Sequence, residues 1–271
     1  MPGSHALKRS STFLTVLTLC ASPLLAQAGT FTGWHLNGNA SLLDNDDTLR
    51  IVPLGSFRVG SAWAPTQLSL LEDFSVAFSF RIGGGSGADG FTLTFQSNDD
   101  GSTTLGSNGG FLGYQGIERS VAFIYDTFDN GFDTDRAPGH NTSVIADGDL
   151  ANGWGGQTVG EAIDINVNDG SLRDAVLYSW IDYDVSLGRF NMFLNDVDTK
   201  PGTPTVGIAS EWQPRLGDSV FVGFTAGTGS LDDNHDILSF SVTTSPVPLP
   251  GAAWLLGSGV LGLAGLARRR R

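Results

Sequence analysis

The sequence predicts an all-β fold, and within that class a sandwich of two sheets. Segments with alternating apolar residues recur through the middle of the chain, and Gly-, Asp- and Asn-rich turns separate them. No long run between these turns has helical spacing. The alternation gives each strand one buried face and one face that is exposed or packs on a second core. We expect a single domain over residues 29–244, a length ordinary for one β-sandwich.

The first residues have the pattern of a secretory signal peptide, expected over residues 1–28. Lys8-Arg9 precede an apolar run at 13–25, and Ala26-Gln27-Ala28 forms a small-residue cleavage site. The run is too short for a membrane-spanning helix, which needs about 20 residues. The only cysteine, Cys20, lies in this run, so the mature protein would have no thiol and no disulfide.

The strands of the domain are expected where apolar residues alternate with small or polar ones. Five such segments follow one another at 74–82, 91–95, 121–125, 190–194 and 220–226. The segment 176–185 is apolar on both faces and is therefore expected to be a strand enclosed between two layers. Turn-forming residues at 83–87 and 97–101 separate neighbouring strands.

The C-terminal residues, 245–271, are expected to form a segment separate from the domain. Val247-Pro248-Leu249-Pro250 precede an apolar span and four terminal arginines. A helix over 249–267 would be about 28 Å long, enough to cross a bilayer core, with the arginines on the cytoplasmic side. This order resembles the PEP-CTERM sorting signal, which an exosortase removes as it passes the protein to the cell surface or extracellular matrix. Leu249 stands where that signal usually has Glu, and a permanent membrane anchor is the alternative.

The domain is strongly acidic once the two end segments are set aside. They hold six of the 15 Lys and Arg residues and none of the 28 Asp and Glu residues, which leaves a net charge of −19. Such a surface repels nucleic acid and anionic lipid, and it suits cations that bind oxygen ligands.

Five separated blocks resemble, in the same order, those of the legume-type (L-type) lectin family. They are 62–80, Ala88-Asp89-Gly90-Phe91-Thr92-Leu93, Gly109-Gly110-Phe111-Leu112-Gly113, 121–140, and the closing pair 222–226 with 235–240. Together they span nearly the whole domain. The resemblance implies the concanavalin A-like or legume-lectin β-sandwich (a jelly roll) and carbohydrate binding.

The resemblance also implies one calcium ion, bound by the loop that begins at Asp126. By position in the family motif, the ligands would be Asp126, the Phe128 carbonyl, Asn130 and Asp135, with Asp133 as the rival to Asp135. These groups supply most of the six to eight hard oxygens that calcium takes. Taken without the other blocks, the same residues would be read as an acidic turn exposed to solvent.

A second, transition-metal ion is expected to be absent. Many plant members of the family bind it with a Glu two residues before the first Asp, a position that Ile124 occupies here. His140 stands where the family has its metal histidine, and without the Glu we expect it to be structural.

The sugar ligands implied by the resemblance are Asp89, Gly110, Phe128 and Asn130. The Asp89 carboxylate would accept charge-assisted hydrogen bonds from adjacent hydroxyls, and the Ala88–Asp89 peptide would be cis. Asn130 and the Gly110 N–H would donate to the sugar, while the Phe128 ring would stack on it.

A last specificity loop is expected between residues 227 and 234. Ser230, Asp232 and Asp233 are its candidates for touching sugar, and the loop does not identify the monosaccharide.

Two other functions compete with a lectin. A retaining glycoside hydrolase on this sandwich needs two carboxylates about 5–5.5 Å apart, and the nearest match, Glu161-Ala162-Ile163-Asp164-Ile165-Asn166, has the wrong spacing. We therefore expect no enzyme. A structural matrix protein without sugar binding is the other alternative, and the presence of Asp89, Gly110, Asn130 and Asp135 argues against it.

The expected protein is thus exported, displayed on the surface or in the extracellular matrix, and binds glycan or exopolysaccharide through a calcium-organised site. Its partners would be carbohydrate and, for the tail, an exosortase-type enzyme, with no nucleic acid and membrane contact only before processing. A single shallow site binds sugar weakly, with a dissociation constant of about 1 mM. Adhesion would therefore need several copies or a homo-oligomer.

Overall fold

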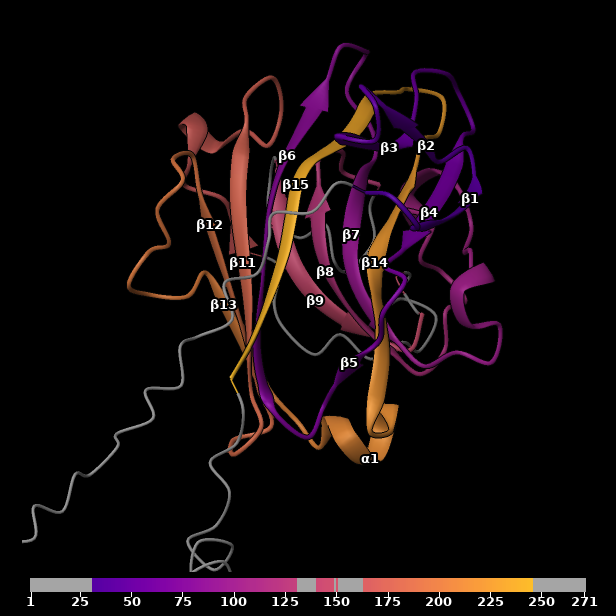
Figure 1. Ribbon diagram of the computed structural model, residues 1–271. Coiled ribbons are helices and arrows are strands. Elements are labelled where there is room, and N and C mark those ends of the chain that lie inside the picture. The colour runs from indigo at the N-terminus through magenta and orange to yellow at the C-terminus, as the bar shows by residue number, and fades with distance from the viewer. Residues whose placement is uncertain (1–30, 131–139, 149, 151–162, 246–271) are drawn as a thin grey trace, which may run out of the picture.

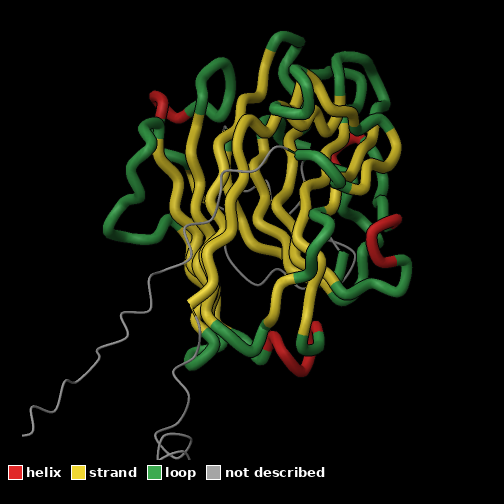
Figure 2. The backbone as a smooth tube through the Cα atoms, in the orientation of Figure 1, coloured by secondary structure: helices red, strands yellow, loops and turns green. Residues whose placement is uncertain are grey.

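The computed structural model describes residues 31–130, 140–148, 150 and 163–245, which form two antiparallel sheets stacked face to face (Figure 1). The tube view in Figure 2 shows strands joined by loops with only short helical turns. The expected all-β sandwich is confirmed. The signal peptide expected at 1–28 and the hydrophobic helix expected at 249–267 lie outside the described residues. Within the part that is described, no helix has the length and apolar character needed to cross a membrane.

The sheet that we call the front sheet has the strand order β1-β4-β14-β7-β8-β9-β10, with β5 paired to β14. Its strands are β1 (His35–Gly38), β4 (Val59–Trp63), β5 (Leu68–Ser69), β7 (Gly90–Gln96), β8 (Ser120–Asp126), β9 (Asn141–Ala146), β10 (Ile163–Asp164) and β14 (Ser219–Gly227).

The opposing back sheet has the order β13-β12-β11-β6-β15-β3-β2. Its strands are β2 (Ser41–Leu43), β3 (Thr48–Val52), β6 (Asp73–Gly83), β11 (Leu177–Asp184), β12 (Arg189–Asn195), β13 (Val206–Ala209) and β15 (Asn234–Ser245). The described helical turns are η1 (Gly101–Thr103), η2 (Gly109–Phe111), η5 (Asn168–Gly170) and α1 (Trp212–Leu216).

The main core lies between the sheets and is built from the alternate apolar residues of the expected strands. Phe80 of β6 contacts Phe91 of β7, with ring centroids 4.9 Å apart in an edge-to-face arrangement. The Phe91 and Tyr125 rings stack with centroids 4.5 Å apart and 4° between their planes. Phe80 also meets the Tyr125 ring edge-to-face at 5.2 Å, so it packs on both rings of the front sheet. Aromatic side chains bury about 150–250 Å² each, so such contacts between the sheets contribute much of the packing energy.

A second, smaller apolar cluster covers the other face of the front sheet. Its buried members are Trp63, Leu112, Tyr114, Ile117, Ala122, Ile124, Ile145 and Leu150. This cluster covers the second face of β8 and β9, which are buried along their whole length. Leu112 and Tyr114 of the cluster follow η2, whose Gly110 lies against Asn130 in the loop after β8.

The expectation that 176–185 is apolar on both faces is wrong. In β11, Leu177, Ser179, Ile181 and Tyr183 are buried and the residues between them are partly exposed. The strand lies in the back sheet, where one face meets the core and the other faces outward. The Tyr178 and Trp180 rings stack on each other at 6.4 Å on this outward face, so aromatic residues on a one-sided strand gave the misleading pattern.

Loops that are distant in sequence meet at one end of the sandwich, which we call the binding end. Gly90, the first residue of β7, pairs with both Asp126 at the end of β8 and Gly227 at the end of β14. In the back sheet, the last residue of β6, Gly83, pairs with the first residue of β15, Asn234. The loops around 83–89, 126–130 and 227–234 are therefore neighbours.

Candidate functional site

Asp89 lies at the centre of the binding end, immediately before β7. Its peptide bond to Ala88 is cis, as the family resemblance implied. The Asp89 N–H donates to the Gly227 carbonyl at 3.3 Å, and the Asp89 carbonyl accepts the Thr127 N–H at 3.0 Å. Only 3% of Asp89 is exposed. The residue is thus held between the loop that follows β8 and the loop that follows β14.

Asn130 reaches the Asp89 carboxylate from the loop after β8. Its Nδ2 donates to Asp89 Oδ1 at 3.2 Å and to the Phe128 carbonyl at 3.1 Å. Gly110 packs directly against this amide, because a Cβ at residue 110 would lie 2.4 Å from Asn130 Cγ and Nδ2. The structure therefore brings Asp89, Gly110 and Asn130 together.

Asp126 and Phe128 form the start of the expected calcium loop. The Asp126 side chain is buried, and its Oδ1 accepts the Phe128 N–H at 2.9 Å. This bond spans two residues, as in an Asx turn. Phe128 is 38% exposed, so its side chain can meet a ligand. The expected fourth ligand, Asp135, and its rival Asp133 lie outside the described residues.

The donor chemistry of this loop suits calcium. A buried carboxylate is stable when it is hydrogen-bonded or binds a cation, and Asp126, the Phe128 carbonyl and Asn130 offer hard oxygens within one short loop. In the described part of the chain, no group of three His, Cys, Asp or Glu side chains could hold a metal ion. Three of the four predicted ligands are thus described, and only one of them is a carboxylate.

The position at which many plant lectins have a metal-binding Glu is apolar here. Ile124 is fully buried in the second apolar cluster, which leaves no ligand at that point.

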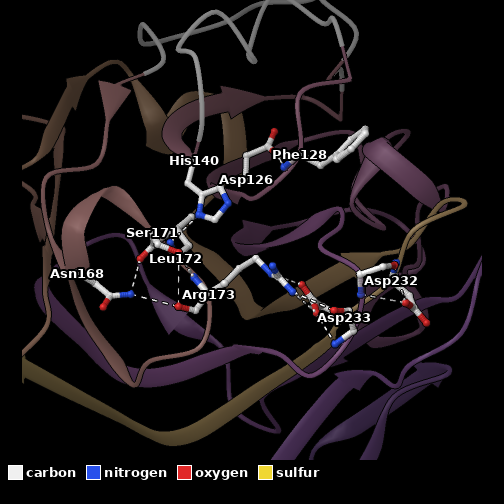
Figure 3. Close-up of polar contacts among 11 residues, drawn as sticks. Asp126, Phe128, His140, Asn168, Ser171, Leu172, Arg173, Asp232 and Asp233 are labelled. Atoms are coloured by element: carbon white, nitrogen blue, oxygen red, sulfur yellow. Dashed lines mark hydrogen bonds and ion pairs between the residues drawn. The ribbon is translucent and has the colours of Figure 1, made fainter.

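The His140 side chain accepts a hydrogen bond from the backbone of another segment. Its Nδ1 accepts the Leu172 N–H at 2.8 Å, which ties the segment before β11 to the start of β9 (Figure 3). Burial, helped by the charge of Arg173, lowers the pKa of His140, while Asp233 and Asp174 oppose the shift. The neutral ring with an accepting Nδ1 agrees with the structural role expected for this residue.

The loop at 227–234 differs from its expected role in one respect. Asp233 is fully buried, and the Arg173 guanidinium donates to both of its carboxylate oxygens, at 2.6 and 3.0 Å. It therefore cannot reach a sugar, and its expected role as a sugar contact is wrong. The Asp232 carboxylate accepts the Gly55 N–H at 2.6 Å. The hydroxyl of Ser86 and the Gly55 N–H lower the pKa of Asp232, and Ser230 is exposed.

Arg173 was not among the sequence-predicted site residues. The domain has few basic residues, so an arginine in it could have been expected to pair with a carboxylate. The sequence does not show which of the many acidic residues would be that partner.

Comparison with known families and proteins gives matches over most of the domain. A family model described as the legume lectin domain matches residues 30–252. Lectin 8 of Medicago truncatula is 27% identical over 198 residues, which is 66% of this chain and 66% of that protein. The L-type lectin-domain containing receptor kinase V.9 of Arabidopsis thaliana is 28% identical over 186 residues, covering 63% of this chain and 27% of the kinase.

Human protein ERGIC-53 is 25% identical over 230 residues, which is 80% of this chain and 41% of that protein. The chain thus spans less than two thirds of the length of the curated relatives it matches.

Solved lectin structures share the fold. Lectin II from Ulex europaeus superposes with a TM-score of 0.64 at 16% identity, over 83% of this chain and 100% of that one. The exoplasmic/lumenal domain of VIP36 in its Ca²⁺/Man₃GlcNAc-bound form has a TM-score of 0.60 at 22% identity, over 81% of this chain and 87% of that one. At these identities the likeness shows the fold alone.

Proposed function

The chain belongs to the legume lectin domain family, and from this premise we propose that it binds carbohydrate through the cluster of Asp89, Gly110, Phe128 and Asn130, which we call the proposed pocket. This is a family of carbohydrate-binding domains and not of enzymes, in agreement with the expectation that the chain is no glycoside hydrolase. The observation that carries the proposal is the hydrogen bond from Asn130 to the Asp89 carboxylate, with Gly110 packed against the same amide. Two polar side chains from separate loops are thus held together at the binding end.

The chemistry of the pocket suits a pyranose. The Asp89 carboxylate would accept hydrogen bonds from vicinal hydroxyls, and charge-assisted bonds are the stronger kind. The Gly110 N–H and the Asn130 amide would act as donors, and glycine at 110 lets the sugar approach the backbone. The exposed Phe128 ring would cover an apolar face of the sugar. Gly229 lies against the carboxylate as well, since a Cβ there would be 3.3 Å from Asp89 Oδ2.

We further propose that one calcium ion organises the pocket. Asp126, the Phe128 carbonyl, Asn130 and Asp135 would hold it, and Asp133 is the alternative to Asp135. When bound, the ion supplies a fixed positive charge that orients these oxygens. Its binding to the Phe128 carbonyl and the Asn130 oxygen would replace the hydrogen bond from Asn130 Nδ2 to Phe128, leaving Nδ2 for Asp89 and the sugar. The Ca²⁺/Man₃GlcNAc-bound form of the VIP36 domain supports this proposal by analogy.

A glycan array tests the lectin proposal. The domain, residues 29–244, would be screened in calcium and in excess chelator, beside Asp89→Ala and a control, Asp198→Ala, at an exposed aspartate in the turn after β12. We expect binding that is lost with chelator and with Asp89→Ala and retained by the control. A folded domain that binds no glycan under either condition would favour a structural matrix sandwich instead.

We also propose that the protein is exported and displayed. The signal-peptide pattern at 1–28 and the PEP-CTERM-like pattern at 245–271 support this, with a retained membrane anchor as the alternative. Mass spectrometry of the protein from cells with and without an exosortase would locate both processed ends. A chain that keeps residues 251–271 when exosortase is present would overturn the sorting role of the tail.

A further inference from the structure

A buried ion pair lies between the segment before β11, which carries Arg173, and the loop after β14, which carries Asp233. Arg173 Nε and Nη2 donate to Asp233 Oδ2 and Oδ1 at 2.6 and 3.0 Å. Figure 3 shows the Arg173 side chain extending from the segment beside His140 toward Asp233. The pair is well shielded from solvent, with the Arg173 side chain 23% exposed and that of Asp233 0%. A forked guanidinium–carboxylate pair fixes direction as well as distance.

The same ion pair holds the Gly85 peptide from both sides. The Gly85 N–H donates to Asp233 Oδ1 at 2.8 Å, and the Gly85 carbonyl accepts Arg173 Nη2 at 3.1 Å. A Cβ on residue 85 would lie 2.3 Å from the Asp232 carbonyl, so the two loops touch at this point. The Asp232 carbonyl also accepts the N–H groups of Ser86 and Gly87, at 2.8 and 3.0 Å.

Both loops then run to the proposed pocket. Gly87 is two residues before Asp89, and a Cβ on it would meet Arg173 Nη1 at 3.2 Å. On the other loop, Gly229 lies next to the Asp89 carboxylate. The Arg173 guanidinium therefore supports the backbone on each side of Asp89 from within the domain.

We propose that Arg173 is a positioning residue for the carbohydrate pocket. Through Asp233 and Gly85 it fixes the spacing of the loops 83–87 and 229–233, and so the placement of Asp89 between them. This inference rests on the proposed function and adds a residue that does not itself touch the sugar. A pocket held in its binding geometry loses less conformational entropy when ligand binds, so the loss of this support weakens affinity.

A neighbouring ion pair provides a matched control. Arg50 donates to both oxygens of Asp236 at 2.7 and 2.8 Å, and the exposures of the two side chains, 24% and 3%, are close to those of Arg173 and Asp233. Asp236 lies only three residues beyond Asp233, within β15. Breaking either pair leaves a buried carboxylate, which lowers stability. Arg81 Nη2 stays 4.0 Å from Asp236, so Arg50→Met should lower stability by no more than Arg173→Met does.

The experiment measures glycan affinity by calorimetry, at saturating calcium, for the unmodified domain, Arg173→Met, Arg173→Lys and Arg50→Met, with the best ligand from the array. We expect Arg173→Met to weaken binding about tenfold or more and Arg50→Met to change it less than about twofold. Arg173→Lys keeps the charge but not the fork, so its affinity should lie between the two. Calcium affinity, titrated separately, should be the same in all four proteins.

Amide hydrogen exchange tests the loop positioning without any ligand. The amides of Gly85, Ser86 and Gly87 should exchange faster in Arg173→Met than in Arg50→Met. Equal exchange, or equal glycan affinity in the two Met variants, would overturn the positioning role. Absence of glycan binding by the unmodified domain would instead overturn the proposed function, and the exchange result would still decide whether Arg173 orders the loops.

Discussion

The Asn130 side chain packs directly against the backbone of Gly110, so even one added methyl group at residue 110 should disturb it. In Gly110→Ala, the added methyl would lie 2.4 Å from the Asn130 amide and push it away from Asp89. We expect glycan affinity to fall about tenfold or more, because a displaced donor loses its bond to the ligand. Titration with glycan measures the effect.

The control for this substitution is Gly202→Ala, since a Cβ at residue 202 would meet no atom within 4 Å. It should leave affinity and stability unchanged. A Gly110→Ala variant that binds glycan as tightly as the Gly202→Ala variant would contradict the packing argument.

How far the sequence predicted individual residues depended on whether their partners were local. Asp126, Phe128 and Asn130 lie within five positions of one another, so the sequence alone shows that their polar groups share one loop. Asp233 was assigned to sugar because its loop position suited that role. Its actual partner, Arg173, is 60 residues away in the chain, and no local pattern connects the two.

At the scale of a single element, substitutions on the two faces of β11 test whether the strand is buried on one face or on both. Ile181 is fully buried against the core, whereas Tyr178 is partly exposed on the outward face. We expect Ile181→Ala to lower the free energy of unfolding by about 3 kcal/mol. Tyr178→Thr keeps a good strand former and should cost less than half as much. Urea denaturation measures both, and equal costs would favour a strand buried on two faces.

The alternating strands were predictable because period-two spacing is a property of the strand itself. The sequence did not predict which face of each strand is covered, because that depends on the sheet to which the strand belongs. The second apolar cluster illustrates this, since Trp63, Tyr114 and Ile145 come from separate blocks of the sequence and meet only in the folded chain.

At the scale of the whole molecule, one buried histidine should make stability depend on pH. Burial lowers the pKa of His235 to about 4, with Arg173 adding to the shift and Asp236 and Asp233 opposing it. In the unfolded chain the imidazole titrates near about 6.5. Between these values the unfolded chain binds a proton that the folded chain does not. The free energy of unfolding should therefore fall as the pH falls through this range, by about 3 kcal/mol.

The measurement is urea denaturation of the unmodified domain and of His235→Gln between about pH 7.5 and about pH 4. The variant has no imidazole at this position, so its stability should decline less steeply with acidity. Parallel curves for the two proteins would show that His235 stays uncharged in both states or titrates equally in both.

Calcium should stabilise the folded domain as a whole if it binds only that form. The melting temperature should rise with calcium concentration, and at about 100 times the dissociation constant the gain is about 2.7 kcal/mol. Asp126→Asn should remove the dependence while leaving the sandwich folded in chelator, since the inter-sheet core does not include the loop. A melting temperature that ignores calcium would contradict the proposed site.

Strand β15 sets the position of the C-terminal end of the domain relative to the proposed pocket. β15 begins beside the pocket, where Asn234 pairs with Gly83, and ends at the other pole, where Ser245 pairs with Asp73. Its 12 residues span about 40 Å. Whatever follows Ser245 therefore departs from the pole opposite the pocket. If the domain is attached to a surface through that end, the proposed pocket faces away from the surface. It is then about one domain length from the surface, where it can contact glycans on another cell or particle.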